Sequence, residues 1–152
     1  MRRLLAGGVI DSSVAVKPVL LDEPLVDAAV AVLAAAAAGS GDRWAVPDLF
    51  DVECASVIRK AVRRSRLGVE QADRALRLLL KLPERRVASA WLAETALTVA
   101  MERSISVYDA CYVALAGLLR VPLVTADERL VRALHGSGHD VVYLADVEVG
   151  PD

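Results

Sequence analysis

Residues 104–134 read "SISVYDACYVALAGLLRVPLVTADERLVRAL" and contain three predicted elements in direct succession. Serine often caps helices, so either Ser104 or Ser106 is expected to begin one, and the nearly uncharged stretch from Ser106 predicts a helix to Leu119. The run "VPLVTA" at 121–126 predicts a short strand, and 127–134 predicts a second helix that begins at an acid. A strand between two helices is typical of a parallel sheet that helices cover on both faces.

The same alternation extends through the chain. Apolar runs predict further strands at 4–10, 44–47, 85–89 and 140–144, and apolar periodicity predicts helices at 22–39, 48–66, 69–82 and 91–103. We therefore expect the α/β class, as a three-layer α/β/α sandwich with a mainly parallel central sheet. The 152 residues suit one domain over residues 1–152.

Composition excludes several classes of protein. With 55% hydrophobic and 25% charged residues the chain is not a disordered protein. The longest uncharged run, 28–41, is shorter than the roughly 18 apolar residues of a membrane span, and Asp11 interrupts the apolar start before it resembles a signal peptide. We expect a cytoplasmic protein with no membrane partner. Cys54 and Cys111 lie in helical apolar patterns, which predicts buried free thiols.

Four acids stand out from these apolar patterns. Asp109 is the only charged residue between Ser106 and Leu119, and an unpaired buried carboxylate is costly. Asp11 ends the first predicted strand and Asp127 follows a later one, so both are expected at the sheet edge where open α/β folds bind ligands. Glu53 has apolar neighbours one turn away on its helix and borders the buried stripe.

Gathered carboxylates repel one another and raise each other's pKa, so a cluster of these four acids needs a cation. Oxygen ligands favour Mg²⁺ or Mn²⁺, and such ions support the hydrolysis of phosphodiesters. Each acid alone also has a structural explanation. Asp11 and Asp127 could be caps, Glu53 could be half-exposed, and Asp109 could be an acid at a helix start. Only the four together favour a metal site.

Basic residues concentrate in the middle of the chain, although the net charge is −2. Residues 59–86 hold ten Lys and Arg against three acids, a local excess of +7. This run is either a solvated helical face or a surface that attracts phosphates.

The chain resembles the PIN-domain ribonucleases. The segments "GGVIDSSVAVK" (7–17), "VPDLFDVECASVIRKAV" (46–62) and 104–134 look like the motifs of that family, in order and over nearly the whole chain. The size resembles that of the VapC toxins of toxin–antitoxin pairs. The resemblance implies an Mg²⁺- or Mn²⁺-dependent endoribonuclease that leaves 3′-hydroxyl and 5′-phosphate ends, forms a homodimer and is inhibited by a small cognate antitoxin.

The resemblance also assigns residues. It implies that Asp11 and Asp109 are the principal metal ligands, and that Glu53 and Asp127 complete the catalytic site or orient water. The hydroxyls that it places beside these acids belong to Ser12, Ser13 and Thr125. The basic segment resembles the arm that flanks the active-site groove in the family, and its candidate contacts to the RNA backbone are Arg59, Lys60, Arg63 and Arg64.

Other functions are compatible with parts of the sequence. A phosphoaspartyl hydrolase would have an acid two residues after Asp11, where this chain has Ser13, and a receiver domain would need a late Lys that is missing. A zinc site at His135 and His139 is disfavoured because Gly136 and Gly138 break the helix that would align them. A PIN-fold housekeeping nuclease without an antitoxin, or a non-catalytic module that binds through its acidic pocket, remains open.

Overall fold

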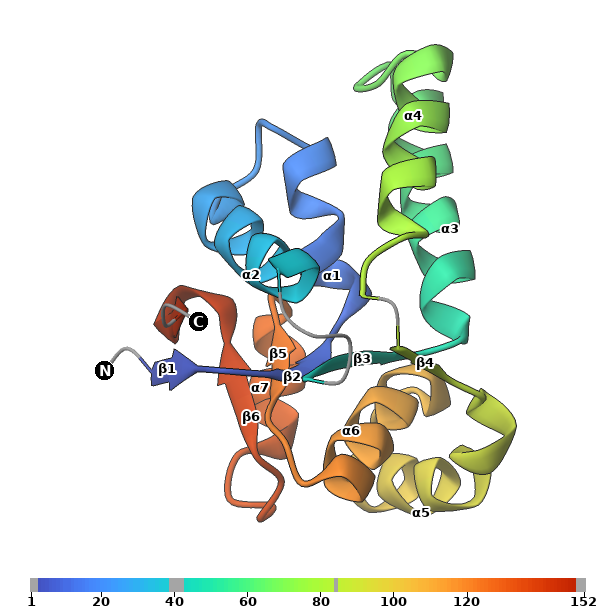
Figure 1. Cartoon of the computed structure of the whole chain (residues 1–152). Helices are drawn as coiled ribbons and strands as arrows, with labels where there is room; N and C mark the ends of the chain where they lie inside the picture. Colours follow the sequence, from blue (N-terminus) through green and yellow to red (C-terminus); the bar gives the residue numbers. More distant parts are fainter. Residues whose placement is uncertain (1–2, 39–42, 84, 150–152) are drawn as a thin grey trace.

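Parallel strands build the central sheet of the computed structural model, which describes residues 3–38, 43–83 and 85–149. In this described part the sheet has five strands in the order β4-β3-β2-β5-β6 (Figure 1). Their bounds are β2 Gly8–Ile10, β3 Trp44–Pro47, β4 Arg85–Val87, β5 Leu123–Thr125 and β6 Val141–Tyr143. The chain builds outward from β2 to β4 and then returns to β5 on the other side of β2. The strand order therefore reverses between β2 and β5.

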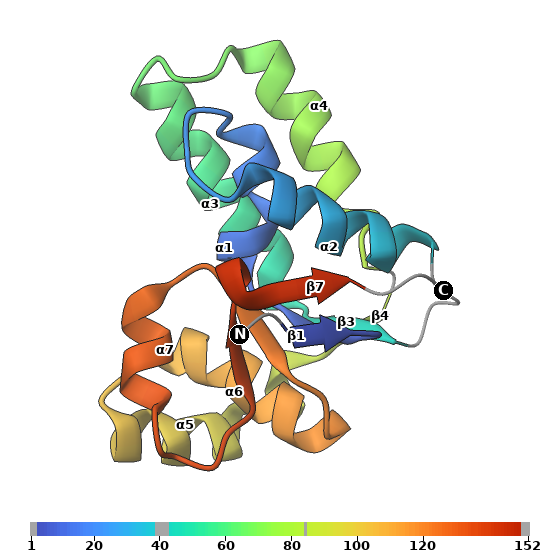
Figure 2. The same cartoon turned by 90° about the vertical axis from the view of Figure 1, so that its left-hand side faces the viewer.

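Helices cover both faces of this sheet, as Figures 1 and 2 show from two directions. One face carries α1 Ser12–Ala15, α2 Val26–Ala38, α3 Leu49–Arg63 and α4 Val69–Leu79. The other carries α5 Ala93–Arg103, α6 Val107–Leu119 and α7 Glu128–Leu134. Single 3₁₀ turns lie at Lys17–Val19, Ser89–Trp91 and Leu144–Asp146. The predicted three-layer α/β/α architecture is confirmed.

The core lies where the sheet meets α3 and α6. Val9 in the middle of β2 is fully buried and is in register with Ala45 of β3 and Leu123 of β5. Phe50 from α3 and Tyr112 from α6 are the largest fully buried side chains. Apolar strands in the middle of a parallel sheet are enclosed in this way because helices pack on both of their faces. In the described ranges, no helix has the length and apolar character that a membrane crossing requires.

The two cysteines behave as expected. Cys54 and Cys111 are both buried and free, which confirms the prediction from their helical apolar surroundings. Burial raises the pKa of the Cys54 thiol to about 12, so this side chain packs as a small apolar group rather than acting as a nucleophile.

The prediction of a single strand over residues 4–10 was wrong. The chain forms β1 Arg3–Leu5, breaks, and continues as β2, while β1 pairs in parallel with the unpredicted β7 Val147–Val149. At the break, a Cβ on Gly7 would lie 2.4 Å from the carbonyl oxygen of Arg43, so the close passage of these two backbones requires glycine. Both strands are short, and they lie beside α2 (Figure 2).

Four helix boundaries also differ from the expected ones. The helix expected over 48–66 ends at Arg63, and Ser65 just after it has a left-handed backbone with φ 55°. The helix expected from residue 22 begins at Val26, because Asp22 and Glu23 stay in a loop where they pair with other segments; its expected end at Gly39 lies outside the described residues. The helix expected over 69–82 ends at Leu79, ahead of Pro83. The helix expected from Trp91 begins at Ala93, after the 3₁₀ turn.

Helices α3 and α4 form a hairpin that extends away from the sheet (Figures 1 and 2). At its base, the Arg86 guanidinium donates from Nε to both oxygens of Asp51 at 3.0 Å and from Nη2 at 2.9 Å. At its far end, Arg66 Nη2 donates to Asp22 at 2.7 Å and to Glu23 at 3.2 Å. The α3–α4 hairpin is thus joined to the rest of the molecule by ion pairs at both ends.

Candidate active site

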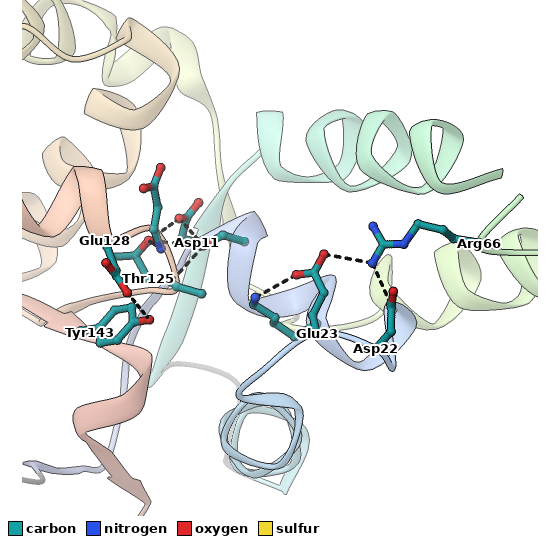
Figure 3. A network of polar contacts seen from close by, with 11 residues as sticks. Asp11, Asp22, Glu23, Arg66, Thr125, Glu128 and Tyr143 are labelled. Carbon is teal, nitrogen blue, oxygen red and sulfur yellow. Dashed lines mark hydrogen bonds and ion pairs between the residues drawn. The ribbon is translucent and has the colours of Figure 1, made fainter. Parts of the chain in front are cut away.

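Asp11 lies at the point where the strand order reverses. It follows β2 directly, is 5% exposed, and its Oδ2 accepts hydrogen bonds from Ser13 Oγ and from Thr125 Oγ1, both at 2.6 Å. Thr125 is the last residue of β5, the neighbour of β2, and Figure 3 shows its side chain reaching Asp11. Adjacent parallel strands bring their carboxyl ends to the same edge, so residues 114 positions apart meet.

Backbone contacts fix which way the two hydroxyls donate. Ser13 Oγ accepts from the Ala126 N–H at 3.0 Å, and Thr125 Oγ1 accepts from the Asp127 N–H at 3.0 Å. Each hydroxyl therefore donates its own proton to the Asp11 carboxylate. Ser12 is 3.5 Å from Asp11 Oδ1, the outer limit of a hydrogen bond, and its hydroxyl lowers the pKa of Glu53. The structure thus places all three predicted hydroxyls beside Asp11 or Glu53.

Glu53 reaches the same place from α3. It lies one turn after the buried Phe50, and its side chain is half-buried. Tyr112 Oη donates a short hydrogen bond to Glu53 Oε2, and the Tyr112 side chain is fully buried. A buried phenol needs a polar partner, and here that partner is a carboxylate on another helix.

Asp109 belongs to the first turn of α6, and of the two expected caps, Ser104 and Ser106, the structure has Ser106. Ser106 Oγ accepts from the Asp109 N–H at 3.0 Å and donates to Asp109 Oδ2 at 2.7 Å. This reciprocal pair satisfies one of the free N–H groups at the helix start. Asp109 is half-buried rather than enclosed, so its helix tolerates it partly for structural reasons.

The three acids lie close enough for their charges to act on one another. Burial raises the pKa of Asp11, the hydroxyls of Ser13 and Thr125 oppose this, and the charge of Asp109 raises it further. Burial also raises the pKa of Glu53, the Tyr112 hydroxyl opposes this, and the charges of Asp11 and Asp109 add to it. Asp11, Glu53 and Asp109 therefore form a cluster of like charges that repel one another; we call it the acidic cluster.

Asp127 is not part of the acidic cluster. Its Oδ1 accepts from the N–H groups of Arg129 at 2.8 Å and Leu130 at 3.4 Å, so its side chain caps α7. It connects to Asp11 only through its own N–H and the Thr125 hydroxyl. The structure thus brings together three of the four predicted acids and places the fourth beside them in a capping role.

The donor chemistry of the acidic cluster fits a hard divalent cation. All candidate ligands are carboxylate oxygens, which Mg²⁺ and Mn²⁺ prefer, and the hydroxyls of Ser13 and Thr125 donate to Asp11. Within residues that the structure describes, no three His, Cys, Asp or Glu side chains are already arranged around a common point that would suit a metal ion. The carboxylates of Glu53 and Asp109 are instead engaged by Tyr112 and Ser106.

A groove of about 490 Å³ leads away from this site. Ser13 and Asp127 line it near the acids, Val57 lines it from α3, and Lys17 and Glu23 line it farther out. Lys17 Nζ donates to Glu23 at 2.9 Å, which extends the Arg66 ion pairs of the hairpin into the groove (Figure 3). The groove therefore begins beside Ser13, a partner of Asp11, and passes α3 at Val57.

The basic excess of the hairpin is smaller than the sequence indicates. Arg66, Arg77 and Arg86 each pair with an acid. The four candidate RNA contacts lie at the far end of α3 and are all exposed: Arg59, Lys60, Arg63 and Arg64.

Comparison with known families gives this arrangement a context. The family model described as the PIN domain matches residues 8–134, from β2 to the end of α7. The chain belongs to the PIN-domain family. The resemblance seen in the three sequence motifs is thereby confirmed, and the matched residues include the whole acidic cluster.

Within the family the similar proteins are VapC ribonucleases. Ribonuclease VapC1 of Mycobacterium tuberculosis is 37% identical over 124 residues, which cover 74% of this chain and 92% of that protein. Ribonuclease VapC9 of the same species is 41% identical over 91 residues, covering 60% of this chain and 70% of that protein. These identities place this PIN-domain protein among the VapC ribonucleases.

Solved structures share the PIN fold. PAE2754 from Pyrobaculum aerophilum superposes with a TM-score of 0.64 at 22% identity, covering 94% of this chain and 93% of that one. A toxin–antitoxin complex from Klebsiella pneumoniae gives a TM-score of 0.61 at 17% identity, covering 91% of this chain and 98% of that one. At these identities the likeness concerns the fold.

One residue of this PIN-domain site was missed from the sequence. Tyr112 follows Asp109 by three positions, which puts both side chains on the same side of α6, and it lies within the aliphatic run that follows Asp109. That spacing could have indicated it, but its partner Glu53 is 59 residues away.

Proposed function

We propose that this protein is a divalent-metal-dependent endoribonuclease that acts in the cytoplasm as the toxin of a toxin–antitoxin pair. The observation that carries the proposal is the acidic cluster: three carboxylates gathered at the switch point of a parallel sheet, where burial and neighbouring negative charge raise the pKa of Asp11 and Glu53. Membership among the VapC ribonucleases supports RNA as the substrate. The catalytic unit would be one domain that spans residues 1–152.

Each residue of the site has a role in this proposal. Asp11, Glu53 and Asp109 would hold Mg²⁺ or Mn²⁺, which when bound neutralises phosphate charge and makes a bound water more acidic. Ser13 and Thr125 keep the Asp11 carboxylate turned toward the carboxyl edge of the sheet through their 2.6 Å hydrogen bonds. Asp127, while capping α7, stands beside Thr125, where we propose that it orients water or completes the metal site.

The test is cleavage of a structured RNA pool by the purified protein, free of any antitoxin. We expect cleavage with Mg²⁺ or Mn²⁺, none with excess EDTA, and recovery when the metal is returned, because the acidic cluster cannot approach a phosphate without a cation. Sequencing of the products should show 5′-phosphate and 3′-hydroxyl ends. Cleavage that continues unchanged in EDTA would contradict the metal proposal. A folded protein that binds no Mn²⁺ and cleaves no RNA would favour the binding-module alternative.

We propose that the RNA backbone runs from the acidic cluster along α3. Val57 lies one turn beyond Glu53 and lines the groove. Lys60 and Arg64 follow Glu53 by about two and three turns, so they continue the same side of the helix. Arg59 and Arg63 are equally exposed but point to a different side of α3. The four predicted basic residues therefore divide into two pairs of equal charge.

This division predicts unequal effects on RNA binding. In an Asp109→Asn background, which separates binding from cleavage, we expect the double change Lys60→Gln and Arg64→Gln to weaken binding of single-stranded RNA. The slope of log K against log salt concentration should fall by about 1.4, since each lost phosphate contact removes about 0.7. The change Arg59→Gln with Arg63→Gln is the charge-matched control and should reduce the slope less. Equal slopes for the two pairs would refute the proposed path.

Two partners complete the proposal. An antitoxin is supported by the VapC relatives and by the structural similarity to a toxin–antitoxin complex. A homodimer is supported by exposed apolar side chains: Leu97 and Met101 lie one turn apart on α5, and Trp91 lies in the 3₁₀ turn before it. A second copy could cover these side chains. A PIN-fold nuclease that works without an antitoxin is the alternative, and it shares the same acidic cluster.

A further inference from the structure

Tyr112 makes a polar contact that packing does not require. Its ring is fully buried between α6 and the sheet, where a phenylalanine would pack equally well. Its hydroxyl nevertheless reaches out of the core and donates to Glu53 Oε2 on α3. A phenol O–H donates and a carboxylate accepts, so Tyr112 is the donor in this contact.

Two hydroxyls lie beside the Glu53 carboxylate, those of Tyr112 and Ser12, and the contact from Tyr112 has the larger effect on the pKa of Glu53. The Glu53 side chain is half-buried, and a glutamate has three rotatable bonds that must be ordered. Asp11, in contrast, is held by two hydroxyls at 2.6 Å, and Asp109 by its cap. The hydrogen bond from Tyr112 is thus the main contact that orients the third carboxylate.

The same helix carries both the phenol and another acid of the cluster. Tyr112 and Asp109 are three residues apart on α6, so they lie on one side of that helix. The bond to Glu53 therefore sets the position of α3 relative to α6 at the height of the acidic cluster. The charges of Asp11 and Asp109 both act on Glu53, which places it near them in this orientation.

We propose that Tyr112 is a positioning residue that holds the Glu53 carboxylate toward Asp11 and Asp109 for divalent metal binding. This inference rests on the proposed function, because it gives Glu53 the role of a metal ligand. It goes beyond that function by naming a residue that touches neither metal nor RNA and yet sets metal affinity. A donor that orients a ligating carboxylate typically changes metal affinity or activity by about 10- to 100-fold.

The test compares Tyr112→Phe with wild type. The change keeps the ring and removes only the hydroxyl, so the fold should persist, and circular dichroism and thermal melting check this. We expect Mn²⁺ binding, followed by electron paramagnetic resonance of the free ion, to weaken by about 10- to 100-fold. RNA cleavage should need correspondingly more Mn²⁺ and should recover at high Mn²⁺, while KM for RNA stays the same.

Tyr143→Phe is the matched control. Tyr143 Oη donates to Glu128 at 3.3 Å, a second tyrosine–glutamate pair that lies outside the acidic cluster, and its loss should leave Mn²⁺ affinity unchanged. Wild-type affinity in a folded Tyr112→Phe protein, or equal losses in both variants, would overturn the inference and leave the proposed function intact. If wild type itself binds no Mn²⁺, the proposed function fails and Tyr112 has no metal ligand to position.

Discussion

Replacing Asp109 with asparagine is expected to reduce RNA cleavage on the order of 10³-fold, with the protein still folded. The carboxylate would supply several kcal/mol of charge stabilisation through the metal, and about 1.4 kcal/mol corresponds to a factor of ten. Asparagine keeps an oxygen that can accept from Ser106 Oγ, and its N–H is still capped, so the start of α6 should be unaffected. Single-turnover cleavage of an RNA substrate at saturating Mn²⁺ measures the effect.

Asp27→Asn is the control for this prediction. Asp27 is an exposed acid in the first turn of α2, and neutralising it changes the net charge by the same amount. Its cleavage rate should stay close to that of wild type. A similar loss in both variants would mean that net charge, rather than the acidic cluster, determines activity. An active Asp109→Asn protein would exclude Asp109 as an essential ligand.

Replacing Asp11 with asparagine is expected to stabilise the metal-free protein while abolishing cleavage. Burial raises the folded-state pKa of Asp11 above its ordinary value of 3.8, so folding favours the protonated form. The contribution of Asp11 to the free energy of unfolding is therefore most favourable below pH 3.8. It falls as the pH rises from 3.8 to the raised pKa, and it stays reduced above that pKa. Asparagine removes this penalty, and we expect a gain of about 2 kcal/mol at pH 7, the size of an incompletely compensated buried charge.

Denaturant unfolding in EDTA between pH 4 and pH 8 measures this gain. The two proteins should differ little at pH 4 and increasingly at higher pH. Asp48→Asn is expected to change stability in the opposite direction. The Ser89 hydroxyl and N–H lower the pKa of Asp48, so the ionised Asp48 side chain stabilises the fold above pH 3.8, and its loss should destabilise the protein there. Mn²⁺ should then stabilise wild type but not the Asp11→Asn protein. A loss of stability in Asp11→Asn at pH 7 would contradict the prediction.

Local features of the sequence predicted much of the fold. The strand at 44–47 agrees with β3 at both ends, and the helix expected from Ser106 agrees with α6 because the cap and the apolar run act within a few residues. The pairing of β1 with β7 joins residues at opposite ends of the chain, and no local pattern reports it. Asp22 was expected at the start of a helix but lies in a loop. The ion pair that holds it there is with Arg66, 44 residues away, and no local pattern indicates that contact.

The acidic cluster shows the same division between local and distant causes. Asp11 and Thr125 could be brought together from the sequence, since parallel strands align their carboxyl ends. Asp127 satisfies the cap pattern of its own helix, and that local role determines its side chain. The contact between Tyr112 and Glu53 depends on how α3 and α6 pack against each other, which residue types alone do not specify.

Helix α3 joins the acidic cluster to the exposed basic residues without a break. Glu53 near its base and Arg64 at its end are separated by about 16 Å at 1.5 Å per residue. Buried Phe50 and Ile58 anchor the helix in the core, and the ion pair between Arg86 and Asp51 holds its base. If RNA follows α3 as proposed, the spacing between the cleaved phosphate and the phosphate bound at Arg64 is therefore set by a helix of fixed length rather than by a loop.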